Sequence, residues 1–451
     1  MRYPPINLTT VTSRPLHAVL FPPESFSAKP GGGRLLDALA AALDGSGPAI
    51  LPLDPGLPRS RLDELLAAFA PAAIETSQGL HRLAPGQYGR VASPGVGGEA
   101  ADETGNAAGC VADEIAVVLA TSGSTGSPKG AELSSRALRF SARASLARLG
   151  ADPGARWLCC LPTHHISGLG VLVRSLVAGS APVVSGRLDA DVVAAADADY
   201  VSLVPTQLRR LLDSGAPAAR FRAILLGGAA VPAGLLDEAA AVGARVVTTY
   251  GMTETCGGCV YDGVPLDGVT VSSGTDGRIK ISGPVLFSGY RRAPELTRSV
   301  LDDGWFVTSD LGGPGPDGRL AVRGRADDVI NTGGEKVVAG EVEQALRECA
   351  GIRDAVVVGV ADPDWGERVV AIVVPADPGP ADPGPADPGG CLLSLERIRE
   401  QVKGTLPRYS APQGLVLIDE IPLLASGKPD RQRLRQLAKE FRHAAAARET
   451  N

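Results

Sequence analysis

Short apolar runs separated by polar turns recur from Ile115 onward and predict buried strands followed by helices. Several runs are apolar at consecutive rather than alternate positions, which is typical of a sheet covered by helices on both faces. A helix expected over Pro232–Val242 fits this alternation. We therefore predict an α/β fold with doubly wound sheets and a site at the carboxyl ends of the strands. The expected strands are Ile115–Ala120, Trp157–Leu161, Tyr200–Val204, Ala223–Leu226 and Val246–Thr249.

The sequence pattern changes after Gly304, where Gly- and Asp-rich turns alternate with short strand-like runs. We place a domain boundary at the end of this stretch, with a large domain over 1–326, a small α+β domain over 327–451 and a hinge near Asp327. Strands are expected before the boundary over Arg278–Ser282 and Arg319–Val322. The small domain is predicted to contain helices over Glu341–Cys349 and Leu395–Leu406 and strands over Ala355–Val360, Val369–Val374 and Leu415–Ile418.

Length, charge and hydropathy narrow the class of protein. A chain of 451 residues with 44% apolar content can build two or more packed cores. Its net charge of −6, without a long Lys/Arg run, argues against a general nucleic-acid binder. No apolar run reaches the roughly 18 to 20 residues of a membrane-spanning helix, and the start lacks the features of a secretory leader. We expect a cytoplasmic protein whose partners include neither nucleic acid nor membrane.

Two features that could suggest a site are interpreted as structural. Cys256 and Cys259 form a C-x-x-C, but no second ligand pair or nearby histidine accompanies them, so we expect small buried residues. The seven cysteines are scattered and odd in number, unlike a secreted disulfide framework. The repeated Pro-Ala-Asp-Pro-Gly over Pro375–Pro388 cannot build a core and is predicted to be a solvent loop without a catalytic role.

A loop of glycines and small hydroxyl residues follows the first expected strand, Thr121-Ser122-Gly123-Ser124-Thr125-Gly126-Ser127-Pro128-Lys129-Gly130. Such a loop can turn backbone N–H and side-chain O–H groups toward phosphate oxygens, and Lys129 adds a positive charge. It is not a Walker A loop, because Lys129 is followed by Gly130 rather than by Ser or Thr. It is not a nucleophile elbow, because Ser122 stands where G-x-S-x-G needs its first glycine. Composition alone leaves a phosphate loop and a flexible linker open.

The loop resembles the phosphate-binding loop of the adenylate-forming superfamily of acyl-CoA synthetases, adenylation domains and luciferases, and further segments of that pattern follow in chain order. They are Gly227-Gly228-Ala229-Ala230, Tyr250-Gly251-Met252-Thr253-Glu254-Thr255, Gly304–Asp310, Gly324–Asp328 with Gly333-Gly334-Glu335-Lys336 and Glu341–Glu343, and Pro422–Lys428. Ser309 replaces a glycine of the pattern and Leu424 a threonine, which bears on nucleotide affinity and on closure of the small domain. The resemblance implies a large adenylate-forming domain followed by a small mobile one.

The resemblance also implies contacts to ATP and Mg²⁺. A hard cation with few protein carboxylates, completing its shell with phosphate oxygens and water, suits Mg²⁺. Joining a carboxylate to ATP brings two anions together, which preorganised cations and dipoles can stabilise. The implied residues are Thr121, Ser122, Thr125 and Lys129 for the β- and γ-phosphates, Thr253 for the α-phosphate, Glu254 for Mg²⁺, Tyr250, Gly228 and Ala229 for adenine, and Asp310 and Arg325 for the ribose hydroxyls.

Lys428 is the residue that the resemblance implies for adenylation of the substrate carboxylate. It stands in Ser426-Gly427-Lys428-Pro429, a sequence typical of an exposed turn that can project a side chain. A rotation at Asp327 would then withdraw Lys428 and bring Gly333 and Gly334 against the pantetheine of CoA, so that one pocket runs two reactions.

The stretch from 157 to 268 more closely resembles the o-succinylbenzoate-CoA ligases of menaquinone biosynthesis. The residues that carry this resemblance are Leu161–Leu169, Ser202–Leu208 and Thr255–Gly263. It implies that His165 gates or lines the acyl site, with Thr206, Gln207 and Arg174 as candidates for contacting a second carboxylate. For Arg174, a charge on an exposed helix face is an equally good interpretation. An H-H-x-x-x-D-G acyltransferase is excluded, because Leu169 occupies the aspartate position.

Three other functions are compatible with parts of the pattern. An aryl- or acyl-CoA ligase of another pathway, and a stand-alone adenylation protein that loads a carrier protein, would share the nucleotide residues. A catalytically inactive nucleotide-binding regulator is disfavoured because Lys129, Glu254, Asp310 and Lys428 occur together. The expected partners are a small carboxylic acid, ATP and CoA, and a homo-oligomer is left open.

Overall fold

The structure is a computed structural model and describes residues 12–21, 34–83, 109–122, 128–232, 234–376, 393–424 and 428–449. The chain divides into two compact units. Unit 1 comprises Met1–Gly228, Ala239–Val271 and Ile281–Val307, and unit 2 comprises Ala229–Glu238, Ser272–Lys280 and Thr308–Asn451. No helix in the described part is both long enough and apolar enough to cross a bilayer.

The first sheet of unit 1 has eight strands in the order β17-β7-β6-β2-β1-β3-β4, with β5 paired to β1. Its centre is parallel, and β4, β5, β7 and β17 run antiparallel to their neighbours. Leu16, Leu51, Phe69 and Val118 belong to its core. The strands are β1 (Ser13–Leu20), β2 (Ala49–Pro52), β3 (Ala73–Thr76), β4 (Gly79–Arg82), β5 (Cys110–Ala112), β6 (Ile115–Ser122), β7 (Pro128–Ser134) and β17 (Gly289–Tyr290), and the connecting helices are α1 (Arg34–Asp44), α2 (Arg59–Phe69) and α3 (Ser135–Leu149).

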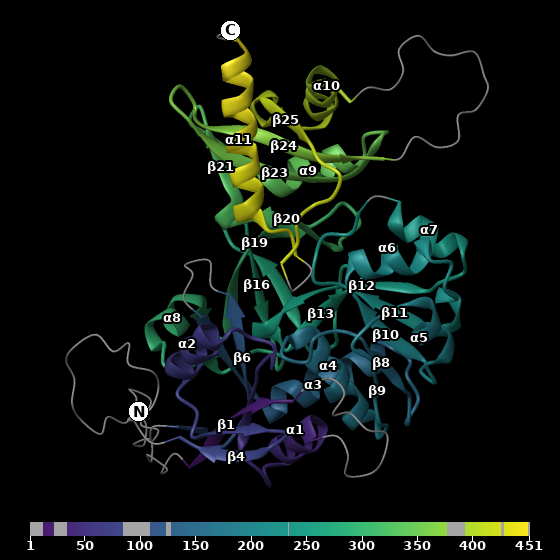
Figure 1. Ribbon diagram of the computed structural model, residues 1–451, viewed down its shortest axis with the longest axis vertical. Helices are drawn as coiled ribbons and strands as arrows, with labels where there is room; N and C mark the ends of the chain where they lie inside the picture. The colour runs from purple at the N-terminus through teal and green to yellow at the C-terminus, as the bar shows by residue number, and fades with distance from the viewer. Residues whose placement is uncertain are drawn as a thin grey trace, which may run out of the picture. The chain divides into compact units, whose positions relative to one another are not determined.

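The second sheet of unit 1 has the order β14-β13-β12-β11-β10-β8-β9, parallel from β12 to β9 (Figure 1). Every residue of β10 and β11 is buried, as their consecutive apolar positions predict. The strands are β8 (Trp157–Cys159), β9 (Val183–Val184), β10 (Tyr200–Leu203), β11 (Ala223–Leu226), β12 (Val246–Met252), β13 (Gly257–Tyr261) and β14 (Val264–Pro265), and the helices are α4 (Ile166–Ala178), α5 (Ala190–Ala195), α6 (Pro205–Asp213) and α7 (Leu235–Ala241). The predicted α/β class with doubly wound sheets is confirmed.

A third sheet has the order β15-β16-β19-β18, with β20 paired to β19. The strand predicted at Arg278–Ser282 is confirmed as β16, and the one predicted at Arg319–Val322 runs instead from Leu320 to Arg325 as β20. The other strands are β15 (Thr270–Ser273), β18 (Leu301–Asp302) and β19 (Trp305–Pro314), and helix α8 spans Pro294–Val300.

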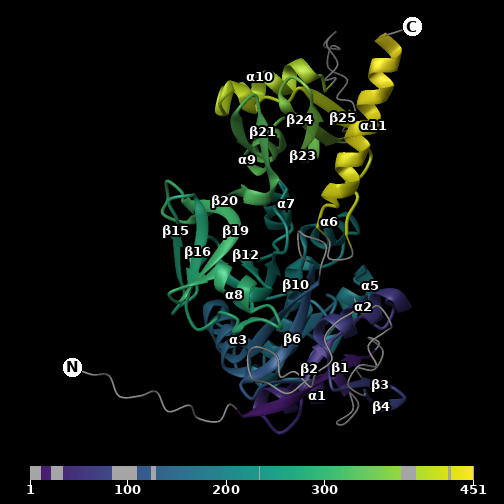
Figure 2. The same cartoon turned by 90° about the vertical axis from the view of Figure 1, so that its left-hand side faces the viewer.

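Unit 2 contains a further sheet with the order β22-β21-β24-β23, in which β25 pairs with β24. Alternate residues of β23 serve two cores: Ala355 and Val357 pack with α9 and α10, while Val356 and Val358 pack with α11. Figure 2 shows α11 on the face opposite α9 and α10. The elements are β21 (Val329–Thr332), β22 (Glu335–Val338), α9 (Ala339–Arg347), β23 (Ile352–Asp362), β24 (Gly366–Pro375), α10 (Leu395–Thr405), β25 (Gly414–Leu417) and α11 (Arg431–Glu449).

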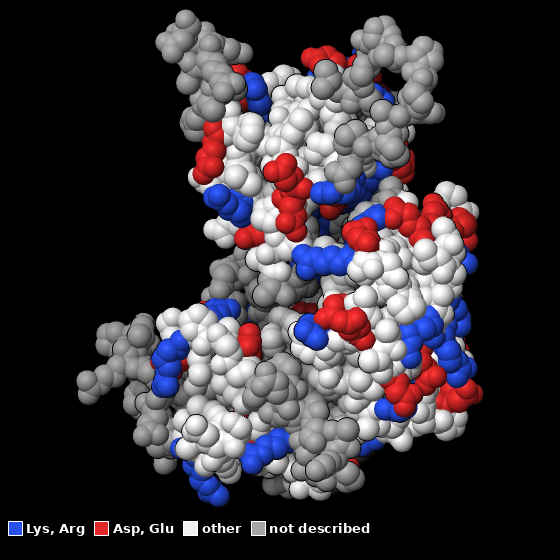
Figure 3. Space-filling view, turned by 45° about the vertical axis from the view of Figure 1, so that its right-hand side comes forward, with Lys and Arg blue, Asp and Glu red and all other residues white. Residues whose placement is uncertain are grey.

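Positively and negatively charged side chains are mixed on the face drawn in Figure 3, where Lys and Arg are interspersed with Asp and Glu. Among the described residues, exposed charged side chains form local pairs, such as Arg59 with Asp63 and Arg222 with Asp152. Pairs of this kind add little stability, since solvent screens them.

Candidate functional site

The predicted phosphate loop is the connection of a β-hairpin. Thr121 at the end of β6 pairs with Lys129 at the start of β7, and the Thr121 hydroxyl donates to the Lys129 carbonyl at 3.3 Å. The two strands therefore fix both ends of the loop. Residues 123–127, including the predicted contact Thr125, and the side chain of Ser122 lie outside the described part of the chain.

The Tyr250–Thr255 segment carries the next group of predicted residues. Tyr250 is half-buried on β12, and a register shift follows between Tyr250 and Gly251. A Cβ at position 251 would lie 2.0 Å from the Gly257 carbonyl oxygen, so only glycine fits this close strand crossing. The chain then forms a 3₁₀ turn over Thr253–Thr255, which the Thr255 hydroxyl stabilises by accepting from the Met252 N–H at 2.9 Å and donating to the Gly257 carbonyl at 2.8 Å. Thr253 and Glu254 are thereby presented at the carboxyl end of β12.

Tyr290 connects these two segments. Its hydroxyl donates to Glu254 Oε1 at 2.7 Å, and the Lys129 Nζ lies 5.7 Å from the centre of its ring. The structure thus brings Lys129 and Glu254 to one aromatic side chain, although 125 positions separate them in the sequence. Tyr290 is 8% exposed. Burial, together with the negative charge of Glu254 and the hydrogen bond, raises the pKa of Tyr290 far above its usual value, so the hydroxyl remains a donor.

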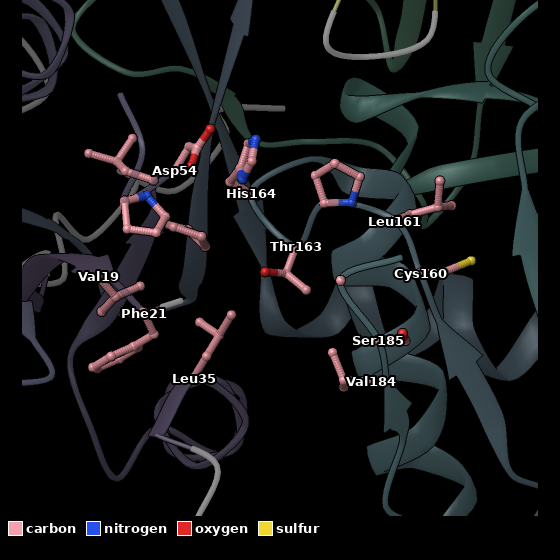
Figure 4. Close-up of a pocket in the computed structure, with 15 residues that line it drawn as sticks. Val19, Phe21, Leu35, Asp54, Cys160, Leu161, Thr163, His164, Val184 and Ser185 are labelled. Carbon is pink, nitrogen blue, oxygen red and sulfur yellow. The ribbon is translucent and has the colours of Figure 1, made fainter. Parts of the chain in front are cut away.

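His165 occupies the position before α4, and its ring packs against that of His164 with the ring centres 4.5 Å apart. His164 lines a pocket together with Asp54 and Thr163 (Figure 4). The walls come from the carboxyl ends of β1, β2 and β8, with Val19, Leu53 and Cys160 among the apolar lining. Burial lowers the pKa of His164, and the nearby Asp54 only partly opposes this. Among the described residues that line this pocket, none is one of the predicted site residues.

Arg174 is half-buried on α4, so its interpretation as a charge on an exposed helix face is wrong. Its guanidinium carbon lies 4.3 Å from the centre of the Trp157 ring, and Nη2 donates to the Ser202 hydroxyl at 2.8 Å. Nε is buried without a hydrogen-bond partner, and no carboxylate of the described residues pairs with this cation. Burial lowers the pKa of Arg174.

The other two candidates for a second carboxylate lie at the start of α6. Thr206 and Gln207 are half-buried. The Gln207 side chain is engaged within the fold, since Oε1 accepts from the Val204 N–H at 3.2 Å and Nε2 donates to the Cys160 carbonyl at 3.4 Å. Arg174 is therefore the only one of the three candidates that carries a positive charge.

In unit 2, the predicted ribose contacts lie opposite one another on antiparallel strands, Asp310 on β19 and Arg325 on β20. Arg325 Nη1 donates to Asp310 Oδ1 at 3.0 Å, and Nη2 donates to Asp327 Oδ2 at 2.9 Å. Burial by itself would lower the pKa of Arg325, but Asp310 and Asp327 outweigh it and the pKa is raised. Arg325 therefore joins the predicted ribose carboxylate to the predicted hinge residue.

Gly333 and Gly334 form the turn between β21 and β22, where Thr332 pairs with Glu335. Both have positive φ, 58° and 85°, as a two-residue hairpin turn of this kind requires. Lys428 is exposed, as predicted, at the end of a loop that is closed by the Leu424 N–H donating to the Lys428 carbonyl at 2.8 Å. Gly228 and Ala229 lie in the turn after β11, one residue beyond its end.

Candidate metal ligands are sparse. Among the described residues, no three His, Cys, Asp or Glu side chains are grouped to hold a metal ion. Cys256 and Cys259 are buried, and burial raises the pKa of Cys259 to about 12, which keeps it a thiol. A single carboxylate, Glu254, fits a Mg²⁺ that takes most of its ligands from nucleotide phosphates and water.

Comparisons with known proteins identify the family of the chain. The family models "AMP-binding enzyme" and "AMP-binding enzyme C-terminal domain" match residues 38–285 and 341–428. A probable 2-succinylbenzoate–CoA ligase (the o-succinylbenzoate substrate under another name) of Mycobacterium tuberculosis is 45% identical over 337 residues, covering 71% of this chain and 84% of that protein. An indoleacetate–CoA ligase of Aromatoleum aromaticum is 34% identical over 354 residues, covering 71% and 67%.

A solved structure is similar over nearly the whole chain. It is the o-succinylbenzoate CoA synthetase of Bacillus subtilis with the acyl-adenylate intermediate, at a TM-score of 0.72 and 26% identity, covering 93% of this chain and 88% of that one. The same enzyme with ATP and a magnesium ion gives a TM-score of 0.71 at 25% identity, covering 93% and 89%.

Proposed function

The chain belongs to the AMP-binding enzyme family, and we propose that it converts o-succinylbenzoate, ATP and CoA to o-succinylbenzoyl-CoA, AMP and diphosphate. The names of its relatives and the ligands in the similar structures support this acid and this acceptor. The reaction would serve menaquinone biosynthesis, and its substrates suit a cytoplasmic location. The partners are then three small molecules.

The observation that carries the choice of acid is the uncompensated charge of Arg174. A cation removed from water costs several kcal/mol unless a counter-ion pairs with it, roughly as estimated for buried ion pairs that lose one partner. Among the described residues no carboxylate supplies that counter-ion to Arg174. The ring carboxylate of o-succinylbenzoate has the right charge, and its two oxygens match the planar guanidinium.

The position of Arg174 on α4 agrees with this role. A Cβ at Gly170 would lie 3.4 Å from Arg174 Nη1, so the guanidinium folds back along the helix toward its N-terminus. His165 stands at that N-terminus, at the end of the connection that leaves the carboxyl end of β8, where ligands of parallel sheets bind. The side chain at Gly170 is absent, which leaves space beside the guanidinium.

The first step joins the succinyl carboxylate to the α-phosphorus of ATP and expels diphosphate. Lys129 and Thr121 stand at the hairpin that would hold the β- and γ-phosphates, and Thr253 would donate to the α-phosphate. Mg²⁺, held in part by Glu254, would neutralise charge on the phosphates. Lys428 would contact the carboxylate and the α-phosphate, and Asp310 with Arg325 would fix the ribose.

The second step forms the thioester. The thiol of CoA attacks the acyl carbonyl of the adenylate, loses its proton, and AMP leaves. We propose the domain boundary after residue 326, with Asp327 as the hinge that exchanges Lys428 for Gly333 and Gly334 between the two steps. The ion pair between Arg325 and Asp327 lies at this point of the chain.

The test is thioester formation with ATP, Mg²⁺, CoA and a panel of o-succinylbenzoate, benzoate, indoleacetate and octanoate, followed by mass spectrometry. We expect o-succinylbenzoyl-CoA with the highest kcat/KM. A higher kcat/KM for another acid would refute the proposed substrate. Indoleacetate is included because one relative is an indoleacetate–CoA ligase. Acyl transfer to a phosphopantetheinyl carrier in place of CoA would instead identify an adenylation protein.

A further inference from the structure

Tyr290 lies where the fold brings two distant parts of the proposed nucleotide site together. It belongs to β17, a two-residue edge strand in which Tyr290 pairs with Ala131 of β7. Lys129 is two residues before Ala131, so its side chain projects from the same face of the sheet as that of Tyr290. Diagonal neighbours of this kind are within reach of long and aromatic side chains, as the 5.7 Å between Nζ and the ring centre shows.

The same segment holds Glu254 from two directions. The Tyr290 hydroxyl donates to Glu254 Oε1 at 2.7 Å, and the Phe287 N–H donates to the Glu254 carbonyl at 2.9 Å. The rings of Phe287 and Tyr290 also meet edge to face, with 4.9 Å between centres. The carboxylate is thus fixed by its backbone and by one of its oxygens, while Oε2 can face a cation without loss of either bond.

Tyr290 itself is anchored by buried contacts. Its N–H donates to the Thr297 hydroxyl at 2.8 Å. The next residue, Arg291, is 5% exposed and donates to the Phe69 carbonyl at 2.6 Å and to the Cys110 carbonyl at 2.9 Å. These bonds tie the edge strand to other parts of unit 1, so the Tyr290 hydroxyl is held in place before any ligand arrives.

We propose that Tyr290 is a positioning residue that orients the Glu254 carboxylate toward a divalent cation on the nucleotide phosphates and keeps the Lys129 ammonium over its ring. This assignment rests on the proposed use of ATP and extends it, because it makes one neutral side chain responsible for aligning an anion and a cation. The hydroxyl acts on metal affinity through Glu254. The ring acts on phosphate affinity through Lys129.

Two substitutions separate these actions in the full-length protein. Tyr290→Phe keeps the ring under Lys129 and removes the hydrogen bond to Glu254, whereas Tyr290→Leu removes both. Tyr261→Phe is the matched control, because the Tyr261 hydroxyl bonds at the same 2.7 Å to Ser145 Oγ, which carries no charge. Thermal melting verifies that each variant folds.

The measurement is equilibrium binding of ATP by calorimetry, with Mg²⁺ and with EDTA. A hydrogen bond to a charged group predicts that Tyr290→Phe lowers the gain in ATP affinity caused by Mg²⁺ about tenfold. The Tyr290→Phe variant should bind ATP in EDTA with nearly unchanged affinity. Tyr290→Leu should lower affinity in EDTA by a further factor of about three, from the lost cation–π contact. Tyr261→Phe should keep the wild-type gain.

Three outcomes contradict the assignment, and they are distinguishable. An unchanged Mg²⁺-dependent gain in Tyr290→Phe would show that the hydroxyl does not orient Glu254. An equal loss of ATP affinity with Mg²⁺ and with EDTA would show that Tyr290 only shapes the ATP site and does not act through the cation. Absence of ATP binding by the wild-type protein would overturn the proposed function itself, and with it the inference.

Discussion

The two units present their proposed catalytic charges in opposite ways. In unit 1, Lys129 and Glu254 both contact the buried Tyr290, whose edge strand is held by hydrogen bonds from Arg291. In unit 2, Lys428 is exposed at the end of a loop. A preorganised set of charges suits the part of ATP that remains in place through the first step, whereas a cation needed for one step only must be able to leave.

The residues that follow Lys428 are nevertheless firmly attached. Arg431, at the start of α11, donates to Glu343 Oε1 at 2.7 Å and pairs with Asp328 at 3.1 Å. Asp328 directly follows the proposed hinge residue Asp327. The loop that carries Lys428 is therefore linked by ion pairs to the hinge turn and to α9, so that Lys428 would move with the residues that follow the proposed hinge rather than independently.

The largest effect should come from removing the exposed cation. We expect Lys428→Ala to lower adenylation by on the order of 10² or more, because a positioned charge is lost from the transition state. Thioester formation from supplied acyl-adenylate should remain close to wild type. Diphosphate exchange and single-turnover thioester assays measure the two steps, with the exposed Lys439→Ala on α11 as control. An equal loss in both steps would refute the assignment of Lys428.

Replacing the half-buried cation Arg174 of unit 1 tests the choice of acid. Arg174→Met should lower kcat/KM for o-succinylbenzoate by roughly 10- to 100-fold, the range for a charge-assisted hydrogen bond, and that for benzoate much less. The melting temperature without ligand should not fall, because methionine removes a charge that lacks a carboxylate partner among the described residues. Arg148→Met is the control, since Arg148 bonds to the Pro265 carbonyl on the same unit.

An equal loss of kcat/KM for both acids in Arg174→Met would show that Arg174 is a structural residue stacked on Trp157. Arg174→Lys adds a second criterion. It keeps the charge but not the planar fork, and should recover only part of the activity toward the dicarboxylate.

The ion pairs of Arg431 and Arg435, which follow Lys428 in the sequence, should contribute unequally to the stability of unit 2. Arg431→Met leaves Glu343, 5% exposed, with one charged partner fewer, and we expect a loss of about 3 kcal/mol of local stability. Arg435→Met removes only an outer contact to Asp328 and should cost about 0.5 kcal/mol. Hydrogen exchange of the β23 amides, referenced to β10 of unit 1, measures both. Similar losses in the two variants would contradict the ranking.

Much of the fold could be predicted because its signals are local. The strands β10 and β11 are short apolar runs followed by turns, and their burial on both faces leaves no polar alternation to obscure them. No element was predicted before Ile115, where β1 mixes buried and exposed positions and β5 has only three residues. The sequence pattern does not predict α11 either, because its mostly polar sequence hides the few residues, such as Leu434 and Ala438, that it buries.

The site residues also differ in how far the local sequence predicts their positions. The phosphate hairpin and the Tyr250–Thr255 segment follow expected strands, so their positions could be predicted from the order of motifs. Tyr290 could not, because it reaches Glu254 only through the pairing of β17 with β7, a long-range contact that no local pattern encodes. Arg174 on α4 is ambiguous in the sequence, since its burial depends on Trp157 of β8 and Ser202 of β10. The predicted domain boundary and the roles of the site residues stay predictions.

The smallest expected effect concerns pH and is confined to unit 1. Burial lowers the pKa of His17 and of His164 below the ordinary 6.5. The unfolded chain therefore binds more protons than the folded one as the pH falls through 6.5, so the ionisation of these residues has no effect on stability well above that pH and destabilises unit 1 progressively below it. We expect the melting temperature of unit 1 to fall between pH 7 and pH 5, and less steeply in His17→Gln and His164→Gln. His81→Gln, which changes an exposed imidazole on β4, is the control. Parallel pH profiles for wild type and for the His17 and His164 variants would show that other groups set the acid sensitivity of unit 1.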